Sequence, residues 1–110
     1  MFKRSTALYL IDILNSIKKI EEYTKKMSYG KFSKDDKTID AVVRNLEIIG
    51  EATRQLPENF KDKHINMPWG RIISMRNKVI HEYSGVDVEI LWQTIHEDLP
   101  ALNGLIKKLV

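Results

Sequence analysis

The chain has 110 residues, of which 43% are apolar and 30% charged, and it contains no cysteine. This is the composition of one globular domain, and it excludes disulfides, thiolate metal sites and a cysteine nucleophile. No apolar run is long enough to span a membrane, and the first residues lack the apolar block of a secretory signal. We therefore expect a single cytoplasmic domain over residues 1–110, whose net charge of +3 is compatible with a nucleic-acid partner without requiring one.

The first half of the chain carries two long runs of apolar residues at helical spacing. One predicts a helix from about Thr6 to Met27, which the sequence Tyr29-Gly30-Lys31 should end. The other predicts a helix from about Asp36 to Leu56, with Ser33 or Asp35 as its N-cap.

The second predicted helix has two unusual features. Gly50 lies inside its apolar stripe, and because glycine costs a helix up to about 1 kcal/mol relative to alanine, we expect another helix to approach closely there. A weaker apolar strip of Ala41, Ile48 and Ala52 lies on the other side. Two strips indicate two partners, so this helix is either central in a bundle or in contact with another chain.

The second half predicts a short helical turn over 57–62 and two further long helices. One should run from about Pro68 to Tyr83, and the other from about Val88 to Val110 with Asp87 as its N-cap. Pro100 should kink or split the last helix, because proline cannot donate a backbone hydrogen bond. Short connections between these helices, with no strand-like alternation, predict an all-α antiparallel bundle of four to five helices without a sheet.

The third long helix has a charge in the middle of its apolar side. On a helical wheel, five apolar or aromatic residues lie within about 60° of Arg76: Trp69, Ile72, Val79, Ile80 and Tyr83. A buried guanidinium needs a partner, so we expect a carboxylate such as Glu47 or Glu51 to support it. An arginine in this place also fits a partly hydrated interface between two chains better than a dry core.

A polar stripe borders that arc and contains Gly70, Ser74, Asn77 and His81. The structural interpretation is that Arg76 forms an ion pair and His81 caps its helix. The chemical interpretation is that the two residues act on a phosphodiester, because arginine binds phosphate oxygens and histidine transfers protons near neutral pH. RNA supplies its own 2′-hydroxyl nucleophile, so such a site needs no metal. Ser74 would then be a supporting residue.

The segment from Arg76 to Tyr83, Arg-Asn-Lys-Val-Ile-His-Glu-Tyr, resembles the Arg-x4-His-x-Tyr motif of the HepT-like branch of the HEPN superfamily. Members of this branch are helical-bundle ribonucleases, many of them toxins of toxin–antitoxin pairs. The resemblance covers nearly the whole chain, and it extends to four further segments in the family's order: residues 9–14, 41–52, 68–69 and 98–100.

The resemblance implies a role for each residue of the motif. Arg76 and His81 would be catalytic, with Arg76 on the phosphate and His81 as general acid or base, while Asn77 would orient the site. Tyr83 resembles the tyrosine to which a cognate minimal nucleotidyltransferase antitoxin transfers AMP. Such a modification places an anionic phosphate beside a phosphate-binding site and should repel RNA.

The resemblance also implies a homodimer in which the motifs meet at the interface, with RNA as substrate and no cofactor or metal. Two other interpretations remain open. The protein could be a catalytically silent module that binds nucleotide and serves its nucleotidyltransferase partner. Alternatively, Arg76 and His81 could be a polar staple within the dimer. The four remaining aromatic and imidazole residues of note, Trp69, Trp92, His64 and His96, are expected to be structural or exposed, because no metal-binding spacing supports the histidines.

Overall fold

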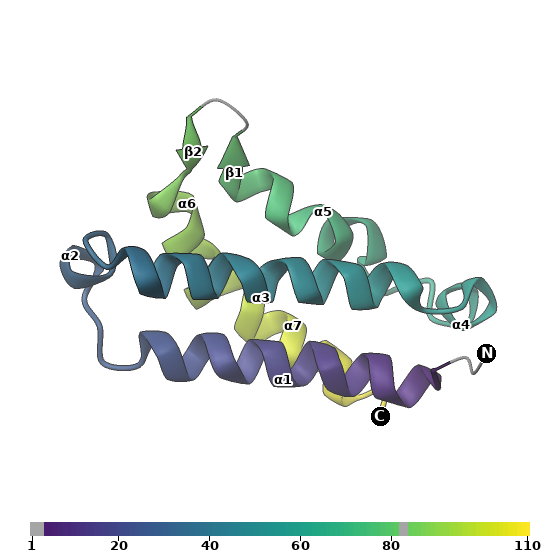
Figure 1. The fold of residues 1–110 in the computed structure, drawn as a ribbon. Coiled ribbons are helices and arrows are strands. Elements are labelled where there is room, and N and C mark those ends of the chain that lie inside the picture. Colours follow the sequence, from purple (N-terminus) through teal and green to yellow (C-terminus); the bar gives the residue numbers. More distant parts are fainter. Residues whose placement is uncertain (1–3, 82–83) are drawn as a thin grey trace.

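Two long helices, α1 (Thr6–Thr24) and α3 (Asp36–Gln55), pack side by side and antiparallel in the computed structural model, which describes residues 4–81 and 84–110 (Figure 1). The short helix α2 (Tyr29–Phe32) lies in the connection between them. The molecule measures 42 × 30 × 30 Å.

Side-chain caps explain where these helices begin. Ser5 accepts a hydrogen bond from the backbone N–H of Leu8, and Asp35 accepts one from Thr38, so Asp35 rather than Ser33 is the cap of α3. The expected end of α1 at Met27 is wrong by three residues, and the expected break at Tyr29-Gly30-Lys31 is also wrong. The chain leaves the helix earlier because Lys26 adopts a left-handed conformation with φ 64°, whereas Gly30 is part of α2.

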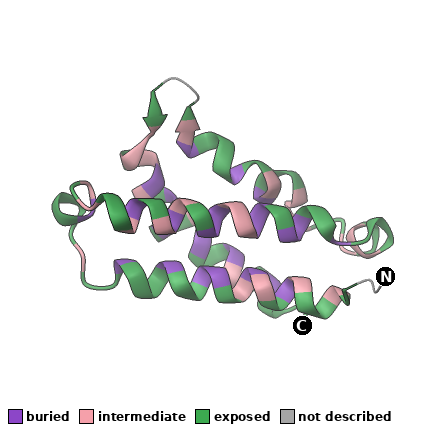
Figure 2. Cartoon of the chain, viewed as in Figure 1, coloured by how far each residue is buried: buried purple, intermediate pink, exposed green. Residues whose placement is uncertain are grey.

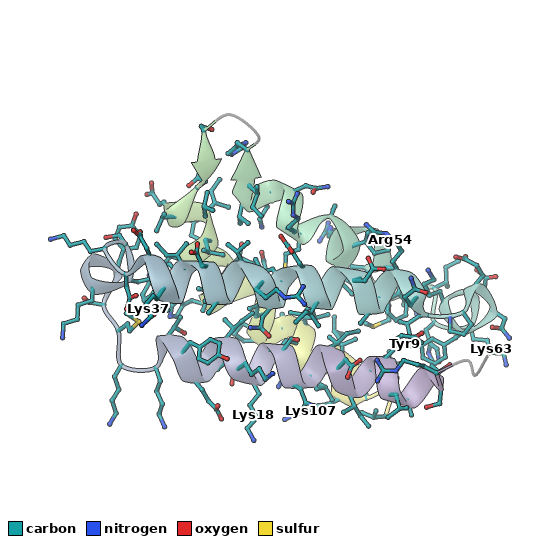
Figure 3. The ribbon with its side chains drawn as sticks, viewed as in Figure 1. Tyr9, Lys18, Lys37, Arg54, Lys63 and Lys107 are labelled. Carbon is teal, nitrogen blue, oxygen red and sulfur yellow. The ribbon has the colours of Figure 1, made fainter. Side chains whose placement is uncertain are left out.

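The predicted apolar stripes form the core. Their buried positions recur along the facing sides of the helices (Figure 2), and charged side chains such as Lys18 and Lys63 project outward (Figure 3). The largest fully buried side chains from the two long helices are Leu10, Ile13, Ile17, Ile20, Val42, Leu46 and Ile49.

Helix α3 is the central element of the bundle. It packs against α1 on one side and against α5 (Trp69–Val79) on the other, so its two apolar strips serve two partners within one chain. The predicted close approach at Gly50 is confirmed. A Cβ on this buried residue would lie only 3.3 Å from the carbonyl oxygen of Ile73 on α5.

The region after α4 (Glu58–Lys63) differs from the sequence expectation. Helix α5 ends at Val79 instead of Tyr83, and two short strands follow: β1 (Ile80–His81) pairs antiparallel with β2 (Gly85–Val86). The expectations of a helix through Tyr83 and of no sheet are therefore wrong here. The half-buried residues Ile80 and Val86 pair across the strands, and Gly85 adopts φ 79°, which an L side chain would strain.

The last helical region is split as expected near Pro100. It consists of α6 (Val88–Gln93), a π-helical segment η1 (Thr94–Asp98) and α7 (Leu99–Lys107), and Asp87 caps α6 through the N–H of Ile90. In η1 the N–H of Leu99 donates to the carbonyl of Thr94, five residues earlier. The wide turn comes directly before Pro100, which has no N–H to donate. Across the described residues, no helix has both the length and the apolar character that a bilayer crossing demands.

Candidate active site

Arg76 lies at the border between the buried side of α5 and solvent, and its side chain is 44% exposed. The buried face of the helix consists of Ile72, Met75 and Val79. The expectation that Arg76 lies in the centre of the apolar arc is therefore wrong. The wheel misplaced that centre because the helix ends at Val79, so Ile80 and Tyr83 do not continue its periodicity.

The partner of Arg76 is Glu47 on α3, with 3.5 Å between Nε and Oε1. The Gly50–Ile73 contact explains this choice, because the two helices run in opposite directions from it. One turn back along α3 leads from Gly50 to Glu47, and one turn forward along α5 leads from Ile73 to Arg76. The ion pair uses Nε, and among the described residues no carboxylate pairs with the two terminal nitrogens. These nitrogens form the edge that binds phosphate in a bidentate manner.

Glu51, the other carboxylate expected near Arg76, binds elsewhere. Its oxygens accept hydrogen bonds from Gln55 (3.0 Å) and Arg54 (2.9 Å) on its own helix. The bond from Gln55, followed by the bond from Arg54, lowers the pKa of the Glu51 carboxyl. In this chain the carboxylate that supports Arg76 is thus Glu47, and Glu51 is an exposed residue of α3.

His81 lies on β1 and is exposed. Successive strand residues point to opposite faces, so Ile80 packs on the core and His81 faces away from it. Its partner across the ladder is Gly85, which has no side chain to cover the imidazole. The hairpin projects from the bundle in Figure 1, and its base is closed by a 2.7 Å hydrogen bond from the Asp87 N–H to the Val79 carbonyl.

The end of α5 lies between Arg76 and His81. On a continuous helix, two residues five positions apart point about 140° apart. Here the N–H of Ile80 donates to the carbonyl of Arg76 as the helix closes, and Ile80 itself is extended with φ −113° and ψ 126°. The predicted loosening of the helix near His81 is confirmed. Helix and strand rises keep the two Cα atoms within about 11 Å, which is within the span of an arginine and an imidazole on one phosphodiester.

The other residues of the polar stripe separate. Gly70, Ser74 and Asn77 form an exposed ridge along α5, whereas His81 leaves the helix. Ser74 Oγ donates to the carbonyl of Arg71 at 3.4 Å, within its own helix. Tyr83 lies outside the described residues.

A groove of about 510 Å³ lies on the other flank of α5, against η1 and α7. Arg71 and Lys78 line it from α5, and Asp98 from η1, with 2.7 Å between Lys78 Nζ and Asp98 Oδ2. The sequence analysis did not identify these residues. The seven-residue spacing of Arg71 and Lys78, which puts both on one face of a helix, is the signal that points to them.

The remaining aromatic and imidazole residues are structural or exposed, as expected. Trp69 donates its indole N–H to the carbonyls of Lys61 and His64, and Trp92 packs on the buried Phe32 at 5.1 Å between ring centroids. His96 is exposed and lies on the ring of Trp92. Over residues 4–81 and 84–110, the histidines and acidic residues form no group of three or more that could hold a metal ion.

Comparison with known proteins places these features in a family. A family model described as "Ribonuclease HepT-like" matches residues 13–109. A protein of Thermococcus cleftensis named "Probable ribonuclease HepT" is 49% identical over 107 residues, which is 97% of either chain.

Two further relatives are named as RNases. A protein of Caldanaerobacter subterraneus, named a putative RNase, is 43% identical over 93% of this chain and 91% of its own. A similarly named protein of Methanocaldococcus jannaschii is 40% identical over 94% of each chain. No solved structure matches this chain.

Proposed function

Because the chain belongs to the HepT-like ribonuclease family of the HEPN superfamily, we propose that it is a metal-independent endoribonuclease whose site contains Arg76 and His81. The observation that carries the proposal is the end of α5 between these two residues, which leaves both side chains exposed and close in sequence. Arg76 presents its terminal nitrogens while Glu47 holds its Nε.

The proposed reaction is an internal transesterification. The 2′-hydroxyl oxygen attacks the adjacent phosphorus, the bond from phosphorus to the 5′ oxygen breaks, and the products carry a 2′,3′-cyclic phosphate and a 5′-hydroxyl. One His81 accepts the proton of the 2′-hydroxyl, and His81 of the partner subunit donates a proton to the leaving 5′ oxygen. Arg76 stabilises the charge that develops on the phosphorane oxygens. Asn77 is the polar neighbour that orients the phosphate.

This two-histidine scheme requires the homodimer. The uncovered ridge of Gly70, Ser74 and Asn77 supports a second chain packing near the site. A two-fold axis beside α5 would bring two copies of the Arg76 and His81 pair to one cleft. Sedimentation at micromolar concentration should give a dimer, and a strict monomer would contradict the scheme.

Cleavage of RNA in EDTA tests the reaction itself. We expect His81→Ala and Arg76→Ala each to lower the rate by about 10²-fold or more, since each removes a proton-transfer group or a charge-stabilising donor. His81→Ala should keep its RNA affinity, whereas Arg76→Ala should lose part of it. A substrate with a 2′-deoxy sugar at the cut should not react, and full activity of both folded variants, or loss of activity on chelation, would overturn the proposal.

We also propose that the protein is a cytoplasmic toxin controlled by a minimal nucleotidyltransferase. In this scheme the Tyr83 phenol oxygen attacks the α-phosphorus of ATP, pyrophosphate leaves, and Tyr83 carries AMP two residues after His81. The added phosphate would repel RNA from Arg76. Incubation with the cognate enzyme and ATP should add one AMP to the intact protein and none to Tyr83→Phe, and a modified protein that still cleaves RNA would contradict the control.

The catalytically silent alternative is a nucleotide-binding partner of the same nucleotidyltransferase. The groove beside Arg71 and Lys78 is the observation that favours it. Nucleotide binding without RNA cleavage would select this alternative. A polar-staple role would instead show as loss of the fold in the alanine variants, although Arg76 and His81 are both exposed in the single chain.

A further inference from the structure

The groove between α5 and α7 has an apolar floor and a charged rim. The floor consists of Ile72, Met75, Leu102 and Leu105, and Leu105 is 37% exposed. A volume of about 510 Å³ is within the range of small-ligand sites, and an open apolar floor of this kind accommodates a flat heterocycle.

The rim favours an anion. Arg71 and Lys78 contribute two positive charges and Asp98 one negative charge, which leaves a net charge of +1 on the lining residues. Lys78 is held by Asp98 at 2.7 Å, and both side chains are substantially exposed, at 52% and 40%, so this ion pair can be exchanged for one with a phosphate. Ser74 adds a hydroxyl group at the same rim.

The position of the groove relates it to the proposed active site. Arg71 and Lys78 lie about 140–160° around α5 from Arg76, with the exposed ridge of Ser74 and Asn77 between the two flanks. A helix with its side chains is about 10–12 Å across, so a short stretch of single-stranded RNA that crosses the ridge reaches both flanks. The wide turn of η1 carries Asp98 to the far wall of the groove, and π-helical turns are frequent at functional sites.

We propose that this groove binds one nucleotide of the RNA substrate near the cut, with its base on the apolar floor and its phosphate on Arg71 and Lys78. The inference rests on the proposed ribonuclease function for the identity of the ligand. Single-stranded RNA is recognised through bases that leave the stack and rest on protein side chains, and this groove offers such a place.

Binding of a free mononucleotide tests the groove without any cleavage step. We expect 5′-AMP to shift the NMR signals of the Met75, Leu102 and Leu105 methyl groups in a saturable way. Ribose 5-phosphate and inorganic phosphate should leave these methyl groups nearly unchanged, because they lack the base. Equal shifts with phosphate alone, or none with 5′-AMP and with a trinucleotide bound to the His81→Ala protein, would overturn the proposal.

Two substitutions with opposite expected signs sharpen the test. Asp98→Asn should tighten binding of 5′-AMP about tenfold, because it releases Lys78 for a charge-assisted bond to phosphate. Glu97→Gln, an exposed neighbour that does not line the groove, is the matched control and should change nothing. Weaker or unchanged binding in Asp98→Asn would contradict the assigned rim.

Filling the groove should have the reverse effect. Ala101 lines it and is exposed, so Ala101→Trp should weaken 5′-AMP binding tenfold or more without disturbing the core, while Ala101→Ser keeps the groove open as its control. In RNA cleavage Ala101→Trp should raise KM and leave kcat nearly unchanged. If cleavage by the parent protein is absent but the nucleotide shifts persist, the proposed function fails and the groove remains a nucleotide site. If cleavage proceeds and Ala101→Trp changes neither KM nor binding, the groove assignment fails alone.

Discussion

Gly50 on α3 and Ile73 on α5 are in such close contact that a Cβ on Gly50 would lie 3.3 Å from the Ile73 carbonyl oxygen. This contact determines the register in which α5 lies on α3. Arg76 is one turn beyond Ile73, so the same contact determines which carboxylate the arginine meets.

Gly50→Leu should destabilise the fold by about 1–3 kcal/mol, because a larger side chain must push α5 away from α3. Since α5 carries Arg76, cleavage by the folded fraction should fall as well. Gly104 on α7 provides the control. Its Cβ would meet nothing within 4 Å, so Gly104→Ala should raise stability by about 0.5–1 kcal/mol. Thermal unfolding measures both, and a Gly50→Leu protein as stable as the parent would show that the helices can separate freely.

Glu47→Ala should lower the cleavage rate about tenfold and leave the fold intact. Its carboxylate holds Arg76 by Nε and so directs the terminal nitrogens outward, while a half-exposed ion pair adds only about 0–1 kcal/mol to stability. The matched control is Glu22→Ala, an exposed carboxylate on α1, which should cleave RNA like the parent. A positioning role predicts a lower kcat with little change in Tm, and a large fall in Tm at constant kcat would refute it.

Gly85→Ala should weaken the hairpin that carries His81. The φ of 79° costs a residue with a Cβ about 1–2 kcal/mol, and strain at this position displaces the partner strand of β1. Gly85→Asn should be milder, because asparagine tolerates the left-handed region better than alanine does. Cleavage assays on the two variants should rank them parent, Asn, Ala, and an Ala variant with full activity would separate the hairpin from the chemistry.

The N-cap of α3 should make stability depend on pH in acid. The Thr38 backbone N–H donates to Asp35 and lowers the pKa of that carboxyl below its ordinary value of 3.8. A lowered pKa in the folded state means that the stabilisation is present above pH 3.8 and is lost as the pH falls through the folded value. The Tm difference between the parent and Asp35→Ala should therefore shrink below pH 3.8. Asp35→Asn still accepts the hydrogen bond but does not titrate, so its Tm difference from Asp35→Ala should persist.

The helical stripes could be predicted because each repeats over many residues. Along α1 and α3 the apolar spacing is regular, and the buried residues are those that the spacing selects. The hairpin could not be predicted in this way, because β1 and β2 have two residues each, too few for an alternating pattern. The error extended the wheel of α5 beyond Val79 and so placed Arg76 too deep in the core.

The choice between Glu47 and Glu51 also exceeds what the sequence can decide. The two carboxylates lie one turn apart on α3, and both are near enough to the α5 side to be plausible partners of Arg76. The axial position of α5 selects between them, and that position depends on contact between backbones at Gly50 and Ile73. The groove residues were missed for a similar reason, because Lys78 and Asp98 are 20 positions apart in sequence.

The π-helical segment η1 has a consequence for the length of the chain that this fold tolerates. A π turn contains one residue more than an α turn, so η1 stores a residue that a regular helix would not need. Deleting one residue from 94–98 would leave a continuous helix but rotate everything after the deletion by about 100° relative to α6. Leu99, Leu102 and Ile106 would then turn out of the core, and residues that now face solvent would turn toward α1. Homologous chains should therefore vary in length in their loops and keep the count between Leu91 and Leu102 constant.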